Sequence, residues 1–354
     1  MNRNEIENGA AADRHVLVVG GAGYVGNVMV RRMLAAGYRV RVLDALAFDH
    51  GSAISPLFDN ERFSFVRGDL RDPAAVAEAA DGVSDLVLLA AIVGDPLCKK
   101  YPEISEDVNV VGPTAMLEAL DGGSVERFLF TSTCSNYGLR TSDEPADETS
   151  ELAPVSLYAE TKVAFEQALL TNASELSFSP TVLRIATAYG LSPRMRFDLT
   201  ISEFTRTLAA GEELVVYDAD TWRPYCHIED ISAAVETVLA APRALVDADV
   251  FNVGHSDENY TKRMVVEAVR RSLHEPGVVE WVEGGTDPRN YRVGFDKIAE
   301  RLGFTPRRRV GEYAAKLIAA VRAGAFDDFV ERDGFYANRT LNLAAPVARL
   351  AEAG

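Results

Sequence analysis

The alternation of short apolar runs with amphipathic segments constrains the fold of this chain most. From residue 15 onward, segments with helical spacing separate most of the runs HVLVVG, RVRVLD, FSFVRGD, DLVLLAA and RFLFTST. Strands that are apolar along their whole length are buried on both faces, and strands joined through helices run parallel. We therefore predict an α/β fold whose doubly wound parallel sheet is covered by helices on both sides.

A glycine-rich turn, VVGGAGYVG, joins the first predicted strand to the first predicted helix. Glycines permit a tight turn and let backbone amides approach a diphosphate at the positive end of the helix. Asp44 ends the second strand about 20 residues later, the spacing of a carboxylate that binds a ribose hydroxyl. Because Asp44 would repel a 2′-phosphate, we predict a Rossmann-type site for NAD rather than NADP. The expected cofactor contacts in the turn are Gly20, Gly23, Tyr24, Val25 and Gly26.

The pattern changes after about residue 190, where the apolar runs become shorter. Helices are expected at about 229–241, 261–272 and 310–323. We predict an NAD-binding Rossmann-type domain over 15–190, to which some later segments return, and a smaller C-terminal α/β substrate-binding region over 191–340. Residues 1–14, which lack the apolar centre of a signal peptide, and residues 341–354 are expected to be tails.

The composition argues against several classes of function. The formal net charge of −17 disfavours nucleic acids and anionic membrane surfaces as partners, but not a small anionic ligand. No apolar run reaches the ~20 residues that a membrane-spanning helix needs. The three cysteines lack CxxC spacing and the five histidines lack an HExxH pattern. We therefore expect a cytoplasmic protein without a disulfide framework or a metal site.

A tyrosine and a lysine lie four residues apart in YAETK, at the start of a helix predicted over about 157–172. Tyr158 and Lys162 therefore share one face of that helix. An ammonium beside a phenol favours the phenolate and brings the tyrosine pKa toward a useful acid–base range. The polar stretch TSTCSNYGL, residues 131–139, follows the fifth strand and can line the same end of the sheet.

Together these motifs resemble the extended short-chain dehydrogenase/reductase family, in particular its nucleotide-sugar epimerases and dehydratases. The likeness covers residues from about 15 to 340 and includes GDL at 68–70, LLAA at 88–91 and NVVGPT at 109–114. The resemblance implies that Thr133 hydrogen-bonds the reacting sugar oxygen and that Tyr158 exchanges its proton. It also implies that Lys162 holds the nicotinamide ribose. It further implies that Asp69 and Leu70 contact adenine, that Ala90 passes near the cofactor, and that Asn109 supports the site.

Some positions depart from the family pattern. Leu88 stands where a histidine is usual, and Thr187 stands where an asparagine commonly touches the sugar-nucleotide diphosphate. Dehydratases carry an Asp-Glu pair after the catalytic threonine, but this chain has Cys134 and Ser135. Cys134 is therefore either an acid–base thiol or a small packed residue. The serine cannot replace a carboxylate base, which disfavours dehydration.

Arginines are expected at the nucleotide-sugar end, because guanidinium groups bind phosphates bidentately. TWRPYCHIEDI is similar to a family segment that carries an arginine and a histidine, and DPRNYRVGFDKIAERLGF to one that supplies a second arginine. In LSPRMRFD, Arg194 or Arg196 would meet a phosphate or a sugar carboxylate. His227 can equally be a packed residue, and Arg292 is the alternate to Arg289. Besides Thr133, the candidate substrate-binding residues are Thr187, Arg194, Arg223, His227, Arg289 and Arg292.

These observations predict an NAD-dependent nucleotide-diphosphate-sugar epimerase that acts at C4 through a transient ketone. The alternatives are a dehydratase or ketoreductase of the same family and, more remotely, an NAD-sensing regulatory protein without catalysis. In the family, two helices of each subunit often form a dimer interface. They correspond to about 103–120 and 157–172 here, so a homodimer is expected.

Overall fold

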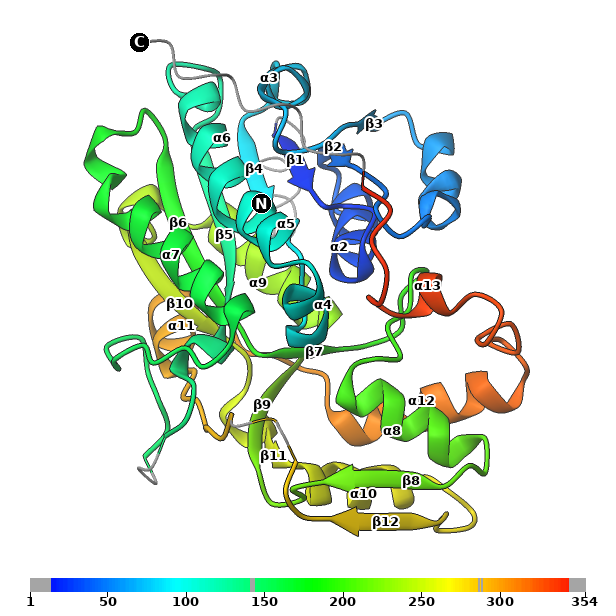
Figure 1. Cartoon of the computed structure of the whole chain (residues 1–354). Coiled ribbons are helices and arrows are strands. Elements are labelled where there is room, and N and C mark those ends of the chain that lie inside the picture. Colours follow the sequence, from blue (N-terminus) through cyan, green and yellow to red (C-terminus); the bar gives the residue numbers. More distant parts are fainter. Residues whose placement is uncertain (1–13, 141–143, 286, 288, 344–354) are drawn as a thin grey trace, which may run out of the picture.

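The structure of the protein, a computed structural model, describes residues 14–140, 144–285, 287 and 289–343. Seven parallel strands form its central sheet in the order β10–β6–β5–β4–β1–β2–β3 (Figure 1). The strand order reverses between β1 and β4, where open α/β sheets bind ligands. The predicted doubly wound parallel sheet is therefore confirmed. The strand bounds are β1 His15–Val19, β2 Arg39–Asp44, β3 Phe63–Arg67, β4 Asp85–Leu88, β5 Arg127–Thr133, β6 Ser179–Ile185 and β10 Asp249–Val253.

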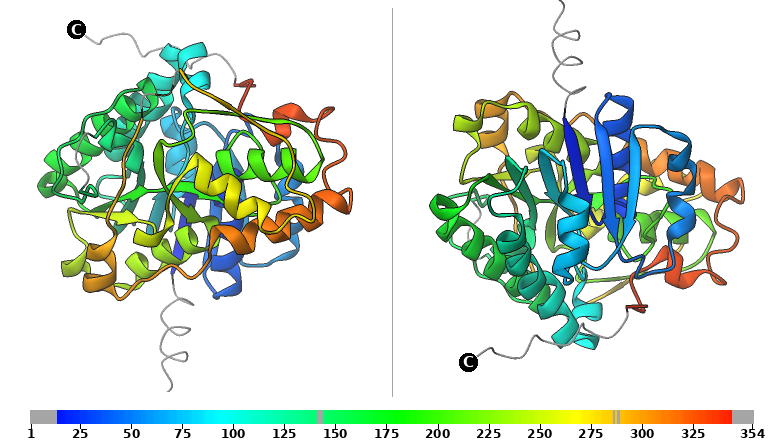
Figure 2. Two further views of the ribbon diagram at one scale, coloured as in Figure 1. Left: turned by 90° about the horizontal axis from the view of Figure 1, so that it is seen from below. Right: turned by 90° about the horizontal axis from the view of Figure 1, so that it is seen from above.

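Helices cover both faces of this sheet (Figure 2). On one face α2 (Tyr24–Ala35) packs against α9 (Ile228–Ala240), and on the other lie α3 (Pro73–Ala80), α6 (Gly112–Leu120) and α7 (Leu157–Thr171). Successive residues of β1 enter opposite cores: Val16 and Val18 join the first, Leu17 and Val19 the second. This alternation explains why the first strand is apolar along its whole length.

The loop after β4 carries the short helices α4 (Asp95–Lys100) and α5 (Pro102–Glu106) and one π-helical turn at Asp107–Val111. Asn109 in that turn holds the loop through its side chain. Its Oδ1 accepts the N–H of Ile92 at 2.7 Å, and its Nδ2 donates to the carbonyl of Ile92 at 3.0 Å and to Thr161 Oγ1 at 3.1 Å. The asparagine thus fixes the loop after β4 against α7.

The remaining strands form two small sheets beside the carboxyl ends of the main sheet. One contains β7 (Thr187–Tyr189), β9 (Trp222–His227) and β11 (Asn259–Thr261), and the other β8 (Leu214–Tyr217) and β12 (Val279–Val282). The chain leaves the main sheet after Ile185, because residues 187–189 pair with β9 instead. VFNVG contributes β10 to the main sheet. The helices here are α8 (Thr200–Ala209), α10 (Lys262–Arg270), α11 (Asp296–Leu302) and α12 (Val310–Arg322).

After α12 the chain passes through α13 (Asp333–Tyr336) and returns to the loop that follows β2 (Figure 1). The N–H of Asn342 donates to the carbonyl of Ala47 at 2.8 Å, and its side-chain amide donates to Asp49 at 3.2 Å. Residues 1–13 and 344–354, most of the two predicted tails, lie outside the described residues. Among the helices that the structure describes, none has both the length and the apolar character needed to cross a membrane.

Candidate active site

A cavity of about 800 Å³ lies at the carboxyl ends of the central strands. One wall comes from the glycine turn and the ends of β1, β2, β4 and β5. The other comes from residues of the 186–200 segment, from β9 and from the C-terminal residues 338, 339 and 343. The cavity therefore lies between the two regions predicted from sequence.

The glycine turn packs so closely that side chains do not fit at two of its positions. Gly20 has φ +87°, and a Cβ there would lie 2.6 Å from the backbone nitrogen of Ala90. A Cβ at Gly26 would lie 2.4 Å from the carbonyl oxygen of Gly20. Gly23 caps α2, so unpaired backbone amides and the positive helix end face the cavity. This geometry fits the diphosphate of a dinucleotide.

Asp44 lies beside the turn at the end of β2. Its carboxylate accepts the N–H groups of Ala22 at 3.0 Å and Leu46 at 2.8 Å, and His50 Nε2 lies 3.4 Å away. These bonds hold the carboxylate at the cavity wall, where the sequence predicts a ribose contact. Tyr24, Val25, Asp69, Leu70 and Ala90 also line this part of the cavity.

Asp69 is held by an ion pair with Arg71 at 2.6 Å. Burial acts to raise the pKa of Asp69, but the hydrogen bonds from Arg71 outweigh it and lower that pKa. The carboxylate therefore stays charged at neutral pH. Its predicted role as an adenine contact, like that of Asp44 at the ribose, stays a prediction.

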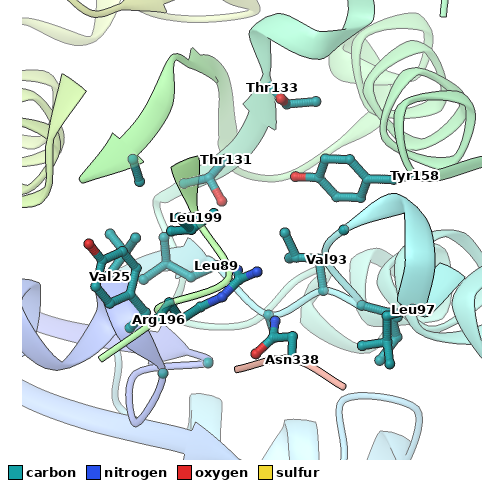
Figure 3. Close-up of a pocket in the computed structure, with 18 of the residues that line it drawn as sticks. Val25, Leu89, Val93, Leu97, Thr131, Thr133, Tyr158, Arg196, Leu199 and Asn338 are labelled. Atoms are coloured by element: carbon teal, nitrogen blue, oxygen red, sulfur yellow. The ribbon is translucent and has the colours of Figure 1, made fainter. Parts of the chain in front are cut away.

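Thr133, Tyr158 and Lys162 line the other end of the cavity. Figure 3 shows the Tyr158 ring entering from α7 with its hydroxyl toward Thr131, and Thr133 lies on the same strand as Thr131, β5. Ser156 caps α7 by accepting the N–H of Ala159, which fixes the start of the helix that carries the tyrosine and the lysine.

The surroundings of Tyr158 and Lys162 shift the pKa values of both side chains. Burial raises the pKa of Tyr158 well above its usual value, and Arg196 and a hydrogen bond with Thr133 oppose the rise. Burial lowers the pKa of Lys162 to about 7, against the opposing charge of Glu166. The Lys162 ammonium lies 4.2 Å from the centroid of the Phe130 ring. Without a ligand, the phenol keeps its proton at neutral pH.

A buried polar network behind this end of β5 was not predicted from sequence. Glu166 forms an ion pair with Arg184 at 2.5 Å, and its other oxygen accepts from Ser132 Oγ at 2.6 Å and Asn136 Nδ2 at 3.2 Å. Glu166 lies one helical turn beyond Lys162, so it belongs to the same face of α7. In the sequence, the four-residue spacing of Lys162 and Glu166 could have indicated that both lie on this face of the helix.

Cys134 points away from the cavity. The residue is buried, and its Sγ donates to the carbonyl of Arg184 at 3.2 Å. Burial raises the pKa of the Cys134 thiol far above neutral pH. Of the two hypotheses from sequence, this placement supports the packed residue rather than the acid–base thiol.

Two of the predicted substrate arginines meet at one acidic residue. Arg223 lies 2.9 Å and Arg289 2.8 Å from Asp287, and Arg289 also lies 3.2 Å from Asp95. Burial acts to raise the pKa of Asp287, but the arginines lower it instead. All four residues line the cavity, as does Thr187.

His227 and Arg292 are not among the residues that line the cavity. His227 caps α9, because its Nδ1 accepts the N–H of Glu229 at 3.1 Å, and its ring packs edge-on against Tyr189. Burial lowers the pKa of His227 to about 4, so the ring is neutral. Arg292 lies 5.2 Å over the Trp222 ring. These placements support a structural role for His227 and favour Arg289 over Arg292.

Arg194 and Arg196 both line the cavity on the segment before α8. Arg196 forms an ion pair with Asp198 at 2.5 Å and points into the cavity near Asn338 (Figure 3). Arg194 donates to Asn338 Oδ1 at 2.6 Å. Phe48, Asn338 and Leu343 also line the cavity, and sequence reasoning missed them because no motif marks them.

Comparison with known proteins agrees with this geometry. The sequence model described as "NAD dependent epimerase/dehydratase family" matches residues 16–254. The UDP-glucose 4-epimerase of Lacticaseibacillus casei is 27% identical over 310 residues, which cover 82% of this chain and 91% of that protein.

Two similar solved structures contain NAD. The dTDP-glucose 4,6-dehydratase DesIV of Streptomyces venezuelae has a TM-score of 0.79 at 25% identity and covers 91% of this chain and 98% of its own. The UDP-glucose 4-epimerase of Thermus thermophilus has a TM-score of 0.74 at 27% identity, with 87% and 99% covered. The chain therefore belongs to the NAD dependent epimerase/dehydratase family.

Proposed function

We propose that this protein is an NAD-dependent epimerase that inverts C4 of a nucleotide-diphosphate sugar. The observation that carries the proposal is the arrangement within one cavity. The glycine turn and Asp44 lie at one end, and Thr133, Tyr158 and Lys162 lie at the other. Relatives named UDP-glucose 4-epimerase cover 82% of the chain, which supports the same reading.

Residues of the chain bind the reacting oxygen and transfer its proton. Bound NAD supplies the chemistry of accepting a hydride from a sugar carbon and returning it. Thr133 hydrogen-bonds the sugar hydroxyl, and Tyr158 removes the hydroxyl proton as the carbon becomes a ketone. Tyr158 gives the proton back after the sugar has turned its other face toward the cofactor. The Lys162 ammonium stabilises the Tyr158 phenolate that exists before the proton is taken up and again after it is returned.

Dehydration is the alternative within the family, and the cavity lacks an available carboxylate for it. Four of the five acidic side chains that line the described cavity form ion pairs with arginines, and the fifth, Asp44, accepts two backbone N–H groups. The ion pairs are Asp69–Arg71, Asp95–Arg289, Asp198–Arg196 and Asp287–Arg223. Elimination of water needs an acid and a base beside the sugar, and Cys134 is buried outside the cavity.

At the other end of the substrate, Arg223 and Arg289 are proposed to bind the nucleotide-sugar diphosphate near Thr187. Asp287 and Asp95 hold both guanidinium groups in place before the substrate arrives.

We further propose a cytoplasmic homodimer that pairs α6 and α7 of each subunit. Val111, just before α6, is 53% exposed, and the three cysteines are free thiols.

The first experiment incubates the purified protein with a panel of nucleotide sugars in deuterated water, without added cofactor. Mass spectrometry should find a product isomeric with its substrate and without deuterium on carbon. Loss of water with deuterium gained at carbon would indicate a dehydratase. Deuterium gained without loss of water would indicate epimerisation beside a transient ketone instead.

A tyrosine variant tests the acid–base role. Tyr158→Phe should abolish turnover, because it removes the proton-transfer group, while NAD stays bound. Tyr217→Phe is the matched control, because Tyr217 on β8 is 51% exposed and outside the cavity lining. Full activity in the Tyr158 variant would refute the mechanism.

A further inference from the structure

Arg194 lies at the cofactor end of the cavity, although its sequence position suggested the substrate. Its loop is fastened to the first turn of α2, because Ser192 Oγ donates to the carbonyl of Tyr24 at 2.8 Å and Tyr24 Oη donates to the carbonyl of Gly190 at 2.7 Å. The Arg194 guanidinium lies 4.7 Å from the centroid of the Phe48 ring, just beyond the end of β2. It therefore lies between the N-terminus of α2 and the residues that follow Asp44.

Among the described residues, no carboxylate lies within ion-pair distance of Arg194, although Asp198 and Asp44 act on its charge from farther away. Arg194 is 2% exposed, and its one described side-chain hydrogen bond goes to the neutral amide of Asn338. Its Nε is buried without a partner. Arg196, by contrast, has Asp198 at 2.5 Å. Burial and the nearby Arg196 lower the pKa of Arg194 to about 9, although the charges of Asp198 and Asp44 oppose this. A buried cation without a counter-ion is costly, so this position favours an anionic ligand.

The C-terminal segment holds Arg194 from the far side. Asn338 accepts from the guanidinium, and its backbone N–H donates to Asp198 at 3.4 Å. Four residues later, Asn342 donates to Ala47 at 2.8 Å. Lys100 donates to the carbonyl of Arg339 at 3.3 Å. The segment thus joins the substrate region, the loop after β2 and α4 across the cavity.

We propose that Arg194, held by Asn338, binds the diphosphate of NAD from the side opposite the helix α2 N-terminus and keeps the cofactor bound through turnover. The amides of the glycine turn and the guanidinium would then hold the two phosphates from both sides. This inference rests on the cofactor site of the proposed function but not on epimerisation, so binding measurements test it separately.

The experiment measures binding of NAD, NADP, ADP, adenosine and UDP to the full chain, together with the rate at which bound NAD exchanges with labelled NAD. Arg194→Gln should weaken NAD and ADP about tenfold to a hundredfold, the range for a hydrogen bond to a charged group. Exchange should accelerate, while adenosine and UDP binding stay unchanged. Asn338→Ala should accelerate exchange by a smaller factor. Arg263→Gln is the control, because Arg263 pairs with Asp220 at an exposed site outside the cavity lining.

Four results would overturn the assignment. Equal losses for adenosine and ADP would mean that Arg194 supports the nucleoside pocket rather than the diphosphate. Weaker UDP with unchanged ADP would place the arginine on the sugar nucleotide. A larger loss for NADP than for NAD would assign it to a 2′-phosphate near Asp44. Loss of epimerase activity alone, with these affinities unchanged, would also contradict it.

Discussion

Replacing Glu166 by glutamine should destabilise the fold by removing one half of a buried ion pair. The side chains of Glu166 and Arg184 are 2% and 6% exposed, and the closest oxygen and nitrogen are 2.5 Å apart. The variant keeps the side-chain shape but leaves the Arg184 charge uncompensated. Such a change costs about 3–5 kcal/mol. With about 2.1 cal/mol/K of unfolding entropy per residue over 354 residues, the melting temperature should therefore fall by about 4–7 °C.

Chemical and thermal denaturation can measure this loss against a matched control. Glu229→Gln breaks the pair of Glu229 with Arg308, whose side chains are 41% and 40% exposed. Exposed pairs contribute about 0–1 kcal/mol, so this control should change stability little. The double variant Glu166→Leu with Arg184→Met should recover part of the loss, because neither charge remains buried. If Glu166→Gln costs no more than the control, the reasoning about burial is wrong.

The same variant should also alter the pH profile. Burial lowers the pKa of Lys162 to about 7, although the charge of Glu166 acts to raise it. Without that charge the lysine pKa falls further, and the ammonium is lost at a lower pH. The alkaline limb of kcat/KM should therefore move toward acid in Glu166→Gln. An unchanged limb would mean that Lys162 does not need its charge for turnover.

Three further predictions follow from single positions. Gly20→Ala should lower both stability and NAD content after purification, because its Cβ would lie 2.6 Å from the Ala90 nitrogen at φ +87°; a thermal shift assay and cofactor absorbance test this. Cys134→Ala should keep turnover within about twofold, since burial holds the thiol protonated; a large loss would restore the acid–base hypothesis. Lys162→Met should change the pH dependence of stability. The folded pKa of Lys162 is about 7 and the unfolded value about 10.4, so the unfolded chain binds more protons between them and wild-type stability, relative to the variant, should rise over that range. Urea denaturation at several pH values measures this rise, and a fall would contradict the sign.

Local patterns in the sequence predicted the sheet and the two ends of the cavity. The glycine turn, Asp44 and the Tyr158–Lys162 spacing each belong to one strand, turn or helix, so their geometry follows from secondary structure. The sheet followed from apolar runs whose residues alternate between two cores. The apolar run at 250–253 lies within 191–340, the predicted substrate-binding region. Strand pairing nevertheless places it in the main sheet as part of β10.

The other side of the cavity could not be predicted in the same way. Arg194 and Asn338 are 144 residues apart, and no local spacing indicates that they meet. Arg223 reaches Asp287 across a shorter gap in the chain, between a strand and a loop. Sequence reasoning named the arginines because their chemistry suits phosphates. It could not identify their partners, which determine whether an arginine is already neutralised.

That distinction explains how an acidic protein can bind two diphosphates. The chain carries a formal charge of −17, yet eight arginines and lysines and five acidic side chains line the described part of the cavity. Four of the five acidic side chains already pair with arginines, so the excess positive charge is concentrated at groups such as Arg194 and Lys162. Net charge describes the surface that large polyanions meet, whereas a small anion responds to the few charges within a Debye length of about 8–10 Å. The composition therefore argued against nucleic acid while leaving the nucleotide-sugar and cofactor sites open.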